Sequence, residues 1–229
     1  MIIAALSDLH LHPSDDNDAD RNLMFILFDL LKEVDTIIFV GDLLEMYIRR
    51  TGEQAHVRAI MMKYSETFGL IAKNMDRFRF INGNHDDECM RFIPAALSAE
   101  FIEIDGFRFI HGHQGDVFFS SKVVNDVVEW VVKMFLRLTG ADHVTQSVRH
   151  NRVAKDLLLR YAIKNYYENG GPSIVAGHTH VKDYVSMPNH WKYINIGATK
   201  NGHILLLDTD SGIFKRVVRR WNNGQRIAV

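Results

Sequence analysis

Short apolar runs alternate with longer amphipathic stretches over the N-terminal part of the chain, and this order limits the sequence to few architectures. A short uninterrupted apolar run is typical of a strand that is buried on both faces. Ile2 to Leu6 is such a run, Thr36 to Val40 is predicted to be a second buried strand, and Phe78 to Ile81 gives a third strand. Residues from about Asp20 to Val34 predict a helix between the first two. This order indicates a mostly parallel sheet with helices packed against it.

A second helix is predicted before the third strand by the spacing of large apolar side chains. These residues recur with the period of an α-helix and have polar residues between them. They are Val57, Ile60, Met61, Tyr64, Phe68 and Ile71. The spacing predicts one helix whose apolar face packs against the sheet.

The second half of the chain predicts a further sheet. Phe101 to Ile104 and Phe107 to Ile110 flank the turn pair Asp105-Gly106, which is a strong hairpin signal. Five later runs also read as strands with turns between them: Ser173 to Ala176, Tyr184 to Met187, Tyr193 to Ile196, His203 to Asp208 and Phe214 to Arg220. These short connections favour an antiparallel second sheet that packs against the first.

One segment interrupts the strands. Residues 120–169 predict two helices joined near Thr139, and we interpret this helical hairpin as a lid-like insertion within a single domain of residues 1–229. The first helix has a wide apolar stripe, which indicates core or a homodimer contact, with a lipid-facing groove at a membrane surface as the alternative. The second is basic, so Arg149 and Arg152 are candidates for binding a substrate phosphate, against the alternative of a solvated face.

Charge and hydropathy exclude two classes of function. The formal net charge is -1, whereas general nucleic-acid binders carry a strong basic excess. The N-terminus lacks a basic segment and Asp8 interrupts its apolar run, so it does not resemble a signal peptide. No uncharged apolar stretch reaches the length of a membrane span. We therefore expect a cytoplasmic protein.

Five short segments place metal-binding side chains at or just after predicted strands. They are Ser7-Asp8-Leu9-His10, Gly41-Asp42, Gly83-Asn84-His85-Asp86, His111-Gly112-His113 and Gly177-His178-Thr179-His180. The carboxyl ends of strands in an open α/β sheet are where ligands usually bind. Together these segments offer enough oxygen and nitrogen atoms for two divalent cations.

The types of residue in these segments limit which metal ions could bind. A carboxylate such as that of Asp42 can bridge two cations, and the carbonyl oxygen of Asn84 adds a ligand without adding charge. Mixed ligation by His, Asp and Asn suits manganese, iron or zinc better than calcium. Manganese is our first expectation, with iron or zinc as alternatives. His113 either lines this site or forms a structural hydrogen bond nearby.

The five segments resemble the signature motifs of calcineurin-like metallophosphoesterases, which read D-x-H, G-D, G-N-H-[DE], H and G-H-x-H. The match runs from Asp8 to His180 in the family's order. The resemblance implies an α/β fold of four layers (α/β/β/α), in which a two-sheet β-sandwich is flanked by helices. It also implies two sets of metal ligands, one of Asp8, His10, Asp42 and His180, and one of Asp42, Asn84, His111 and His178.

The same resemblance implies the chemistry. In such enzymes a water activated between two cations attacks phosphorus and cleaves a phosphomonoester, a phosphodiester or a pyrophosphate. His85 matches the family's histidine that is not a ligand and is the expected general acid. Glu45 lies where some members carry a carboxylate that orients this histidine.

The substrate is less defined. Gly41 to Tyr47 resembles the G-D-L-[FL]-E-x-[WY] of UDP-2,3-diacylglucosamine hydrolases, which act in lipid A synthesis and carry a helical lid. His85 and His113, however, stand where that branch often has Arg and Asp. We expect a phosphorylated small molecule, a nucleotide or a lipid-linked substrate. A protein-binding scaffold without activity is the alternative from another class, and the intact ligand set argues against it.

Overall fold

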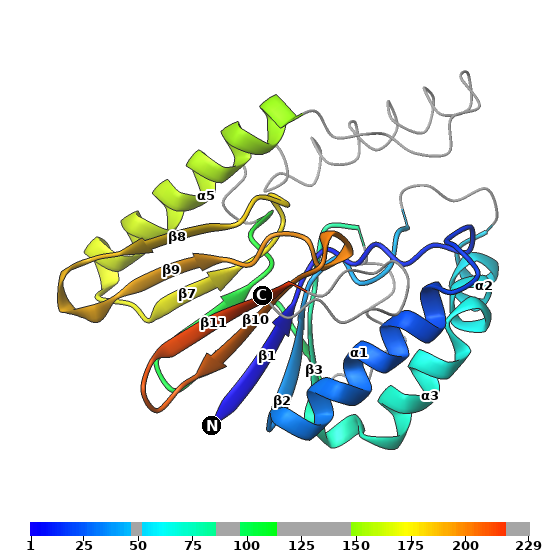
Figure 1. The fold of residues 1–229 in the computed structure, drawn as a ribbon. Coiled ribbons are helices and arrows are strands. Elements are labelled where there is room, and N and C mark those ends of the chain that lie inside the picture. The colour runs from blue at the N-terminus through cyan, green and yellow to red at the C-terminus, as the bar shows by residue number, and fades with distance from the viewer. Residues whose placement is uncertain (47–51, 86–96, 114–147, 219–229) are drawn as a thin grey trace.

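The computed structural model describes residues 1–46, 52–85, 97–113 and 148–218. In these ranges the chain forms two β-sheets that face each other, with helices on the outer face of each sheet (Figure 1). The predicted α/β fold with two sheets flanked by helices is therefore confirmed. The first helix of the predicted insertion falls outside the described residues, and the second is α5 (Val148–Asn169).

The first sheet has six strands in the order β11-β10-β1-β2-β3-β4. Their bounds are β1 (Ile2–Leu6), β2 (Thr36–Val40), β3 (Phe78–Ile81), β4 (Ser98–Ala99), β10 (His203–Asp208) and β11 (Ile213–Val218). Strands β1 to β4 pair in parallel, whereas β10 and β11 are antiparallel additions beside β1. The parallel arrangement brings the carboxyl ends of β1, β2 and β3 to one edge.

The second sheet has five strands in the order β5-β6-β7-β9-β8. Their bounds are β5 (Phe101–Ile104), β6 (Phe107–Ile110), β7 (Ser173–Ala176), β8 (Asp183–Ser186) and β9 (Lys192–Asn195). The hairpin predicted around Asp105-Gly106 is confirmed as β5 and β6. The central strands β6, β7 and β9 pair in parallel, and only the two edge strands are antiparallel.

The prediction of an antiparallel second sheet made of all the C-terminal strands is wrong in two respects. Parallel neighbours need a crossover connection, and the chain between β6 and β7 includes α5 on the outer face of this sheet. The last two strands return to the first sheet instead of extending the second. Strand β10 can lie inside the first sheet because Ile204 is buried toward the helices while Leu205 and Leu207 are buried toward the second sheet.

Three helices cover the outer face of the first sheet: α1 (Ala19–Glu33), α2 (Glu53–Lys63) and α3 (Ser65–Lys73) (Figure 1). The single helix predicted across Tyr64 is wrong, because the chain breaks there into α2 and α3. The carboxylate of Asp20 accepts the main-chain N–H groups of Glu66 (3.0 Å) and Thr67 (2.9 Å), which caps the start of α3 from a distant helix. Met61, predicted to face the sheet, is 49% exposed.

Three short 3₁₀ turns complete the described elements: η1 (Met75–Arg77), η4 (Pro188–His190) and η5 (Thr199–Asn201). Among the helices of the described part, none has the combination of length and apolar character that crossing a membrane requires.

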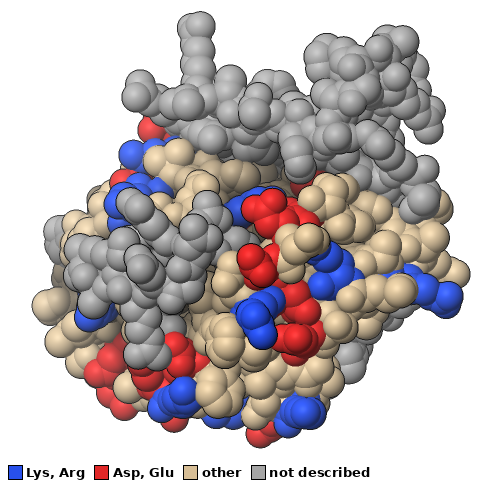
Figure 2. Space-filling view, turned by 45° about the vertical axis from the view of Figure 1, so that its right-hand side comes forward, with Lys and Arg blue, Asp and Glu red and all other residues tan. Residues whose placement is uncertain are grey.

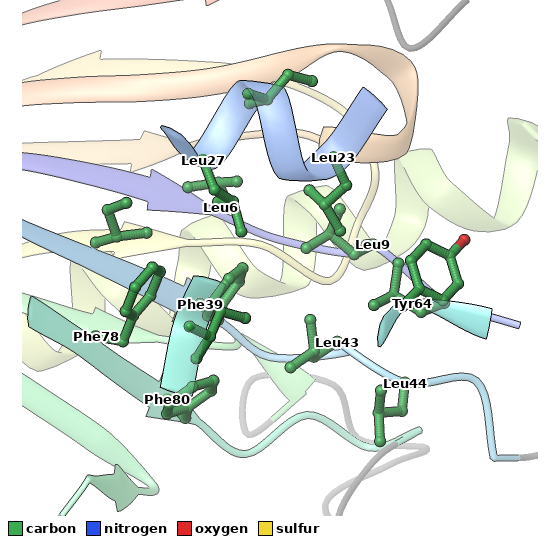
Figure 3. Packing of buried hydrophobic residues seen from close by; sticks show 14 of the residues in the cluster. Leu6, Leu9, Leu23, Leu27, Phe39, Leu43, Leu44, Tyr64, Phe78 and Phe80 are labelled. Carbon is green, nitrogen blue, oxygen red and sulfur yellow. The ribbon is translucent and has the colours of Figure 1, made fainter. Parts of the chain in front are cut away.

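Apolar side chains fill three interfaces, which correspond to the three contacts of a four-layer fold. Alternate side chains of β1 belong to two of these interfaces. Ala4 and Leu6 face the helices, whereas Ile3 and Ala5 face the second sheet. Figure 3 shows the first interface, where Leu23 and Leu27 of α1 lie over the sheet near Leu6 and Phe39. A third cluster packs α5 on the second sheet. The ends of the strands, from which the ligand loops begin, are therefore packed on both faces of the first sheet and on both faces of the second.

Candidate metal centre

The predicted ligands come together from both sheets. Asp8, Asp42 and Asn84 follow β1, β2 and β3 of the first sheet, whereas His111 and His178 follow β6 and β7 of the second. All five are buried. Because the sheets face each other, the loops at these strand ends meet at one edge of the sandwich.

The ligand loops have an unusual backbone. Five predicted ligands have a positive φ: Asp8 (55°), His10 (47°), Asp42 (52°), His178 (68°) and His180 (56°). Residues other than glycine seldom adopt this region, although Asp, Asn and His tolerate it best. Each such residue costs of the order of 1–3 kcal/mol, and such strain concentrates at functional sites. The strained positions here coincide with the candidate ligands.

One group of donor atoms surrounds the loop of β1. Oδ1 of Asp8 lies 3.3 Å from Nε2 of His180, and the same Nε2 lies 3.1 Å from Nε2 of His10. One ligand atom from each of these residues lies within 4.8 Å of the others. Two imidazoles and one carboxylate at this spacing match the predicted ligands of the first cation.

A second group surrounds the loops of β2 and β6. Nε2 of His111 lies 3.2 Å from Oδ2 of Asp42 and 3.2 Å from Oδ1 of Asn84, and His178 completes a cluster with Asp42 and His111. Oδ2 of Asp42 also lies 3.7 Å from Nε2 of His10 in the first group. Asp42 therefore lies between the two groups, as a bridging carboxylate would.

Hydrogen bonds at the back of the imidazoles fix which nitrogen faces the centre. Nδ1 of His111 donates to the main-chain oxygen of Val40 (2.9 Å), and Nδ1 of His10 donates to Oε2 of Glu45 (3.1 Å). These bonds leave Nε2 of each ring free of a proton when a metal binds. Metal-ligating histidines usually have such a partner, which sets the tautomer and orients the ring.

Only one of the two carboxylate oxygens of Asp8 accepts hydrogen bonds from the described residues. Its Oδ2 accepts hydrogen bonds from Oγ of Ser7 (2.5 Å) and from the main-chain N–H of His178 (3.0 Å). Its Oδ1 is buried and accepts no hydrogen bond from the described residues, although Nε2 of His180 faces it at 3.3 Å. A buried oxygen without a donor is unfavourable unless a cation or a polar group faces it. Oδ1 therefore suits a metal. Ser7 is not singled out by the sequence, where it is only a small residue before a motif.

The electrostatics of the site favour bound positive charge. Burial alone would raise the pKa of Asp8, but the neighbouring His180 outweighs it and lowers this pKa to about 2. Burial likewise opposes charge on His111, yet Asp42 raises its pKa to about 10. The pKa of Asp42 lies well below its usual range despite complete burial, because His111 and His85 face it. The buried carboxylates that favour protons on these imidazoles would also favour cations at the same place, and binding of a metal would release those protons, so these residues fit the metal pair.

Three motif glycines allow this close approach of the loops. A Cβ atom at Gly83 would lie 2.1 Å from Oδ1 of Asp42, and one at Gly41 would lie 2.3 Å from Nδ1 of His111. At Gly177 it would lie 1.7 Å from Oγ of Ser7. Any larger residue at these positions would separate side chains that now converge.

The two residues with predicted catalytic roles lie beside the metal ligands. Nδ1 of His85 donates to Oε1 of Glu45 (2.9 Å), while the other oxygen of this carboxylate receives His10. Burial opposes protonation of His85, but Glu45 and then Asp42 raise its pKa to about 9. Burial alone would raise the pKa of Glu45. The neighbouring His85 and His10 outweigh burial, so the pKa of Glu45 lies well below its usual value. Glu45 thus links a candidate acid to a candidate ligand.

The remaining predicted residues are placed as follows. The ring of His113 lies 5.5 Å from that of His111 and 6.4 Å from that of His178, between ring centroids, so it borders the site. Arg149 and Arg152 lie in the first part of α5, but their side chains are outside what the structure describes. Their role in phosphate binding stays a prediction.

A family model described as "Calcineurin-like phosphoesterase" matches residues 1–182. No curated protein sequence matches the chain.

Several solved structures are similar to the chain at low sequence identity. A metallophosphoesterase from Sphaerobacter thermophilus is 15% identical, with 95% of this chain and 88% of that chain covered and a TM-score of 0.47. A phosphoesterase from E. coli is 13% identical, with 95% and 99% covered and a TM-score of 0.43. A predicted phosphoesterase from Streptococcus pneumoniae is 14% identical, with 95% and 97% covered and a TM-score of 0.40.

Proposed function

The chain belongs to the calcineurin-like phosphoesterase family, and we propose that it is a hydrolase that cleaves phosphoesters at a pair of divalent cations. Asp8, His10, Asp42 and His180 would hold one cation, and Asp42, Asn84, His111 and His178 the other. The position of Asp42 between two groups of donor atoms supports this proposal most directly. Manganese is the proposed metal, with iron or zinc as alternatives, because the donors mix imidazole with oxygen.

The cations would supply an activated water and neutralise the charge of the phosphoryl oxygens. The protein's own task is to orient the ester and to protonate the departing oxygen. His85 suits the second role, because Glu45 binds its Nδ1 and leaves Nε2 as the atom that donates a proton. The raised pKa of about 9 keeps the ring protonated at neutral pH in the metal-free protein. His113 borders the site and is a candidate contact for the substrate.

For the substrate we propose a phosphorylated small molecule, a nucleotide or a lipid-linked substrate. On the face shown in Figure 2, acidic and basic side chains lie close to one another, and no extended basic patch is visible among the described residues. A long phosphate backbone would need such a patch. A reaction like that of UDP-2,3-diacylglucosamine hydrolases is favoured by Leu43, Leu44 and Glu45 after Gly41-Asp42. The histidine at position 85 favours a simpler phosphoester.

The test is hydrolysis by the purified protein loaded with Mn²⁺, Zn²⁺ or Fe²⁺. The panel contains bis-p-nitrophenyl phosphate, p-nitrophenyl phosphate, nucleotides, sugar phosphates and a UDP-acyl-sugar. Asp42→Asn should lose at least about 100-fold in turnover, as expected when a metal ligand is removed. Asp76→Asn makes the same chemical change at an exposed site and should leave turnover unaltered.

The panel separates three outcomes. Hydrolysis restricted to the UDP-acyl-sugar would assign the protein to the lipid branch, and broad cleavage of monoesters would remove it from that branch. A protein that binds these metals at neither group and cleaves no member of the panel would contradict the enzyme proposal. That result would favour a protein-binding scaffold.

A further inference from the structure

The segment of residues 195–199 is the place where the chain crosses from the second sheet to the first. It begins at the end of β9 and continues into η5, which precedes β10. We propose that this crossing segment is a positioning element that holds one metal-ligand loop of each sheet. Thr199 would fix the loop of Asp8, and Asn195 the loop of His178. The effect on metal affinity rests on the proposed metal centre, whereas the effect on the loops does not.

Thr199 holds both main-chain polar groups of Ser7. Its N–H donates to the carbonyl oxygen of Ser7 (2.7 Å), and its Oγ1 accepts the N–H of Ser7 (2.9 Å). The same hydroxyl donates to the carbonyl oxygen of His203 at the start of β10 (2.9 Å). Thr199 is 1% exposed. The residue that directly precedes Asp8 is thus fixed at two points by a buried side chain and its backbone.

Asn195 acts in the same way on the other sheet. Its Nδ2 donates to the carbonyl oxygen of Gly177 (2.9 Å), the residue before His178. Its Oδ1 accepts the N–H of Gly197 (3.1 Å), which fixes the orientation of the carboxamide. Asn195 is fully buried, so water does not compete for these bonds and losing one of them leaves a buried group without a partner.

Backbone strain explains why such support is needed. Asp8 and His178 both have a positive φ, which persists only where the surroundings determine the conformation. The two loops are also joined directly, because the N–H of His178 donates to Oδ2 of Asp8. Asp8 and His178 belong to different predicted ligand sets. A shift of either loop would therefore change the spacing between the two sets.

The test compares variants of two buried threonines. Thr199→Val removes the hydroxyl with little change in volume, and Thr199→Ser restores it. Thr209→Val is the matched control, because Thr209 is also buried and its hydroxyl bonds to Oδ2 of Asp105 (2.7 Å) and to the carbonyl oxygen of Met1 (3.2 Å). Thr209 lies near the start of β1, whereas Thr199 lies beyond its end. Asn195→Asp is a second variant, which keeps the acceptor oxygen and loses the donor to Gly177.

Two measurements are made on each variant. Hydrogen exchange of the metal-free protein reports the loops of residues 7–10 and 177–180, and calorimetric titration reports Mn²⁺ affinity. Thr199→Val should speed exchange in residues 7–10, Asn195→Asp in residues 177–180, and both should weaken Mn²⁺ binding about 10- to 100-fold. Thr199→Ser should restore both properties. Thr209→Val should alter neither.

Unchanged loop exchange in Thr199→Val and Asn195→Asp would overturn the positioning role. An equal effect of Thr209→Val would also overturn it, because the loops would then respond to general destabilisation. If the unmodified protein binds no Mn²⁺, the proposed metal centre fails, and the exchange comparison still decides whether the crossing segment holds the loops.

Discussion

Gly83 is the position where one added methyl group should most damage the proposed centre. A Cβ atom there would lie 2.1 Å from Oδ1 and 2.2 Å from the main-chain nitrogen of Asp42. The second contact is with backbone, which cannot rotate away as a side-chain end can. Oδ1 of Asp42 also accepts the N–H of His85 (2.9 Å). Gly83→Ala therefore forces apart two loops that share the central carboxylate.

The size of the effect follows from the distance. The Asp42 loop must move by about 1 Å or more before these contacts reach the ordinary range that begins at 3.4 Å. A misplacement of about 1 Å in a catalytic group can lower the rate about 100-fold. Forcing extra atoms into a packed interior costs about 1–3 kcal/mol of folding free energy. We expect Gly83→Ala to fold, with turnover at least about 100-fold lower and Mn²⁺ binding weakened.

Gly69→Ala is the matched control. Gly69 lies in α3, and a Cβ atom there would meet nothing within 4 Å. The free energy of unfolding should rise by about 0.5–1 kcal/mol, as for other glycines replaced by alanine within helices. The assays are turnover of bis-p-nitrophenyl phosphate, Mn²⁺ titration and urea unfolding. Wild-type Mn²⁺ affinity and turnover in Gly83→Ala would refute the assignment of Asp42 to the centre.

Three further predictions concern the acid, the charges and the packing. His85→Ala should keep its metal content. Its turnover should fall more on alkyl esters than on nitrophenyl esters, because the departing alkyl oxygen needs a proton. Equal losses on the two kinds of ester would contradict the role of His85 as the acid. The pKa of Asp8 is lowered from 3.8 to about 2, so its stabilising effect is present above pH 3.8 and is lost as the pH falls toward 2. Urea unfolding of chelator-treated protein should show this loss, about 2 kcal/mol, and Asp8→Asn should lack it. Tyr64→Phe removes a buried hydroxyl that donates to Asp15 (2.5 Å) and should cost about 1–3 kcal/mol in the same assay, whereas Tyr167→Phe, at a residue 70% exposed, should cost almost nothing.

The sequence predicted those parts of the fold that depend on local pattern. The bounds of β1, β2 and β3 agree with the predicted strands, because strands buried on both faces are rich in apolar residues. The segments of Asp8, Asp42 and Asn84 follow those strands, so the convergence of these three could be inferred from the parallel order of the first sheet. The antiparallel assignment of the second sheet failed because strand pairing depends on partners that are distant in sequence.

The break at Tyr64 and the support of the ligand loops could not be read from the sequence. The apolar spacing continues through Tyr64, and the break is stabilised by Asp20, which lies in another helix. Thr199 contacts Ser7 across almost the whole chain. Asp20 and Thr199 both lie outside the five motif segments. Such hydrogen bonds have no periodic signal, because they depend on the final arrangement of the loops.

The strained backbone of the ligands leads to a last prediction, made for His180. Its φ is 56° and its side chain is 24% exposed. The alanine and glycine variants remove the same ring, so the packing lost is the same in both. His180→Ala and His180→Gly both remove the metal ligand, but only the glycine variant also relieves the strain. A left-handed backbone costs residues other than glycine about 1–2 kcal/mol. His180→Gly should therefore be more stable than His180→Ala by about 1 kcal/mol in chelator-treated protein.

The order of stability of the Gly and Ala variants at position 180 distinguishes a strained backbone from an ordinary one. At an ordinary backbone position glycine is less stable than alanine by about 0.5–1 kcal/mol, because it loses more freedom on folding. Urea unfolding of the two variants should give the opposite order at position 180. The ordinary order would show that the ligand loop relaxes once the imidazole is gone. The strain would then belong to the side chain's contacts with Asp8 and His10, and the fold itself would not impose it.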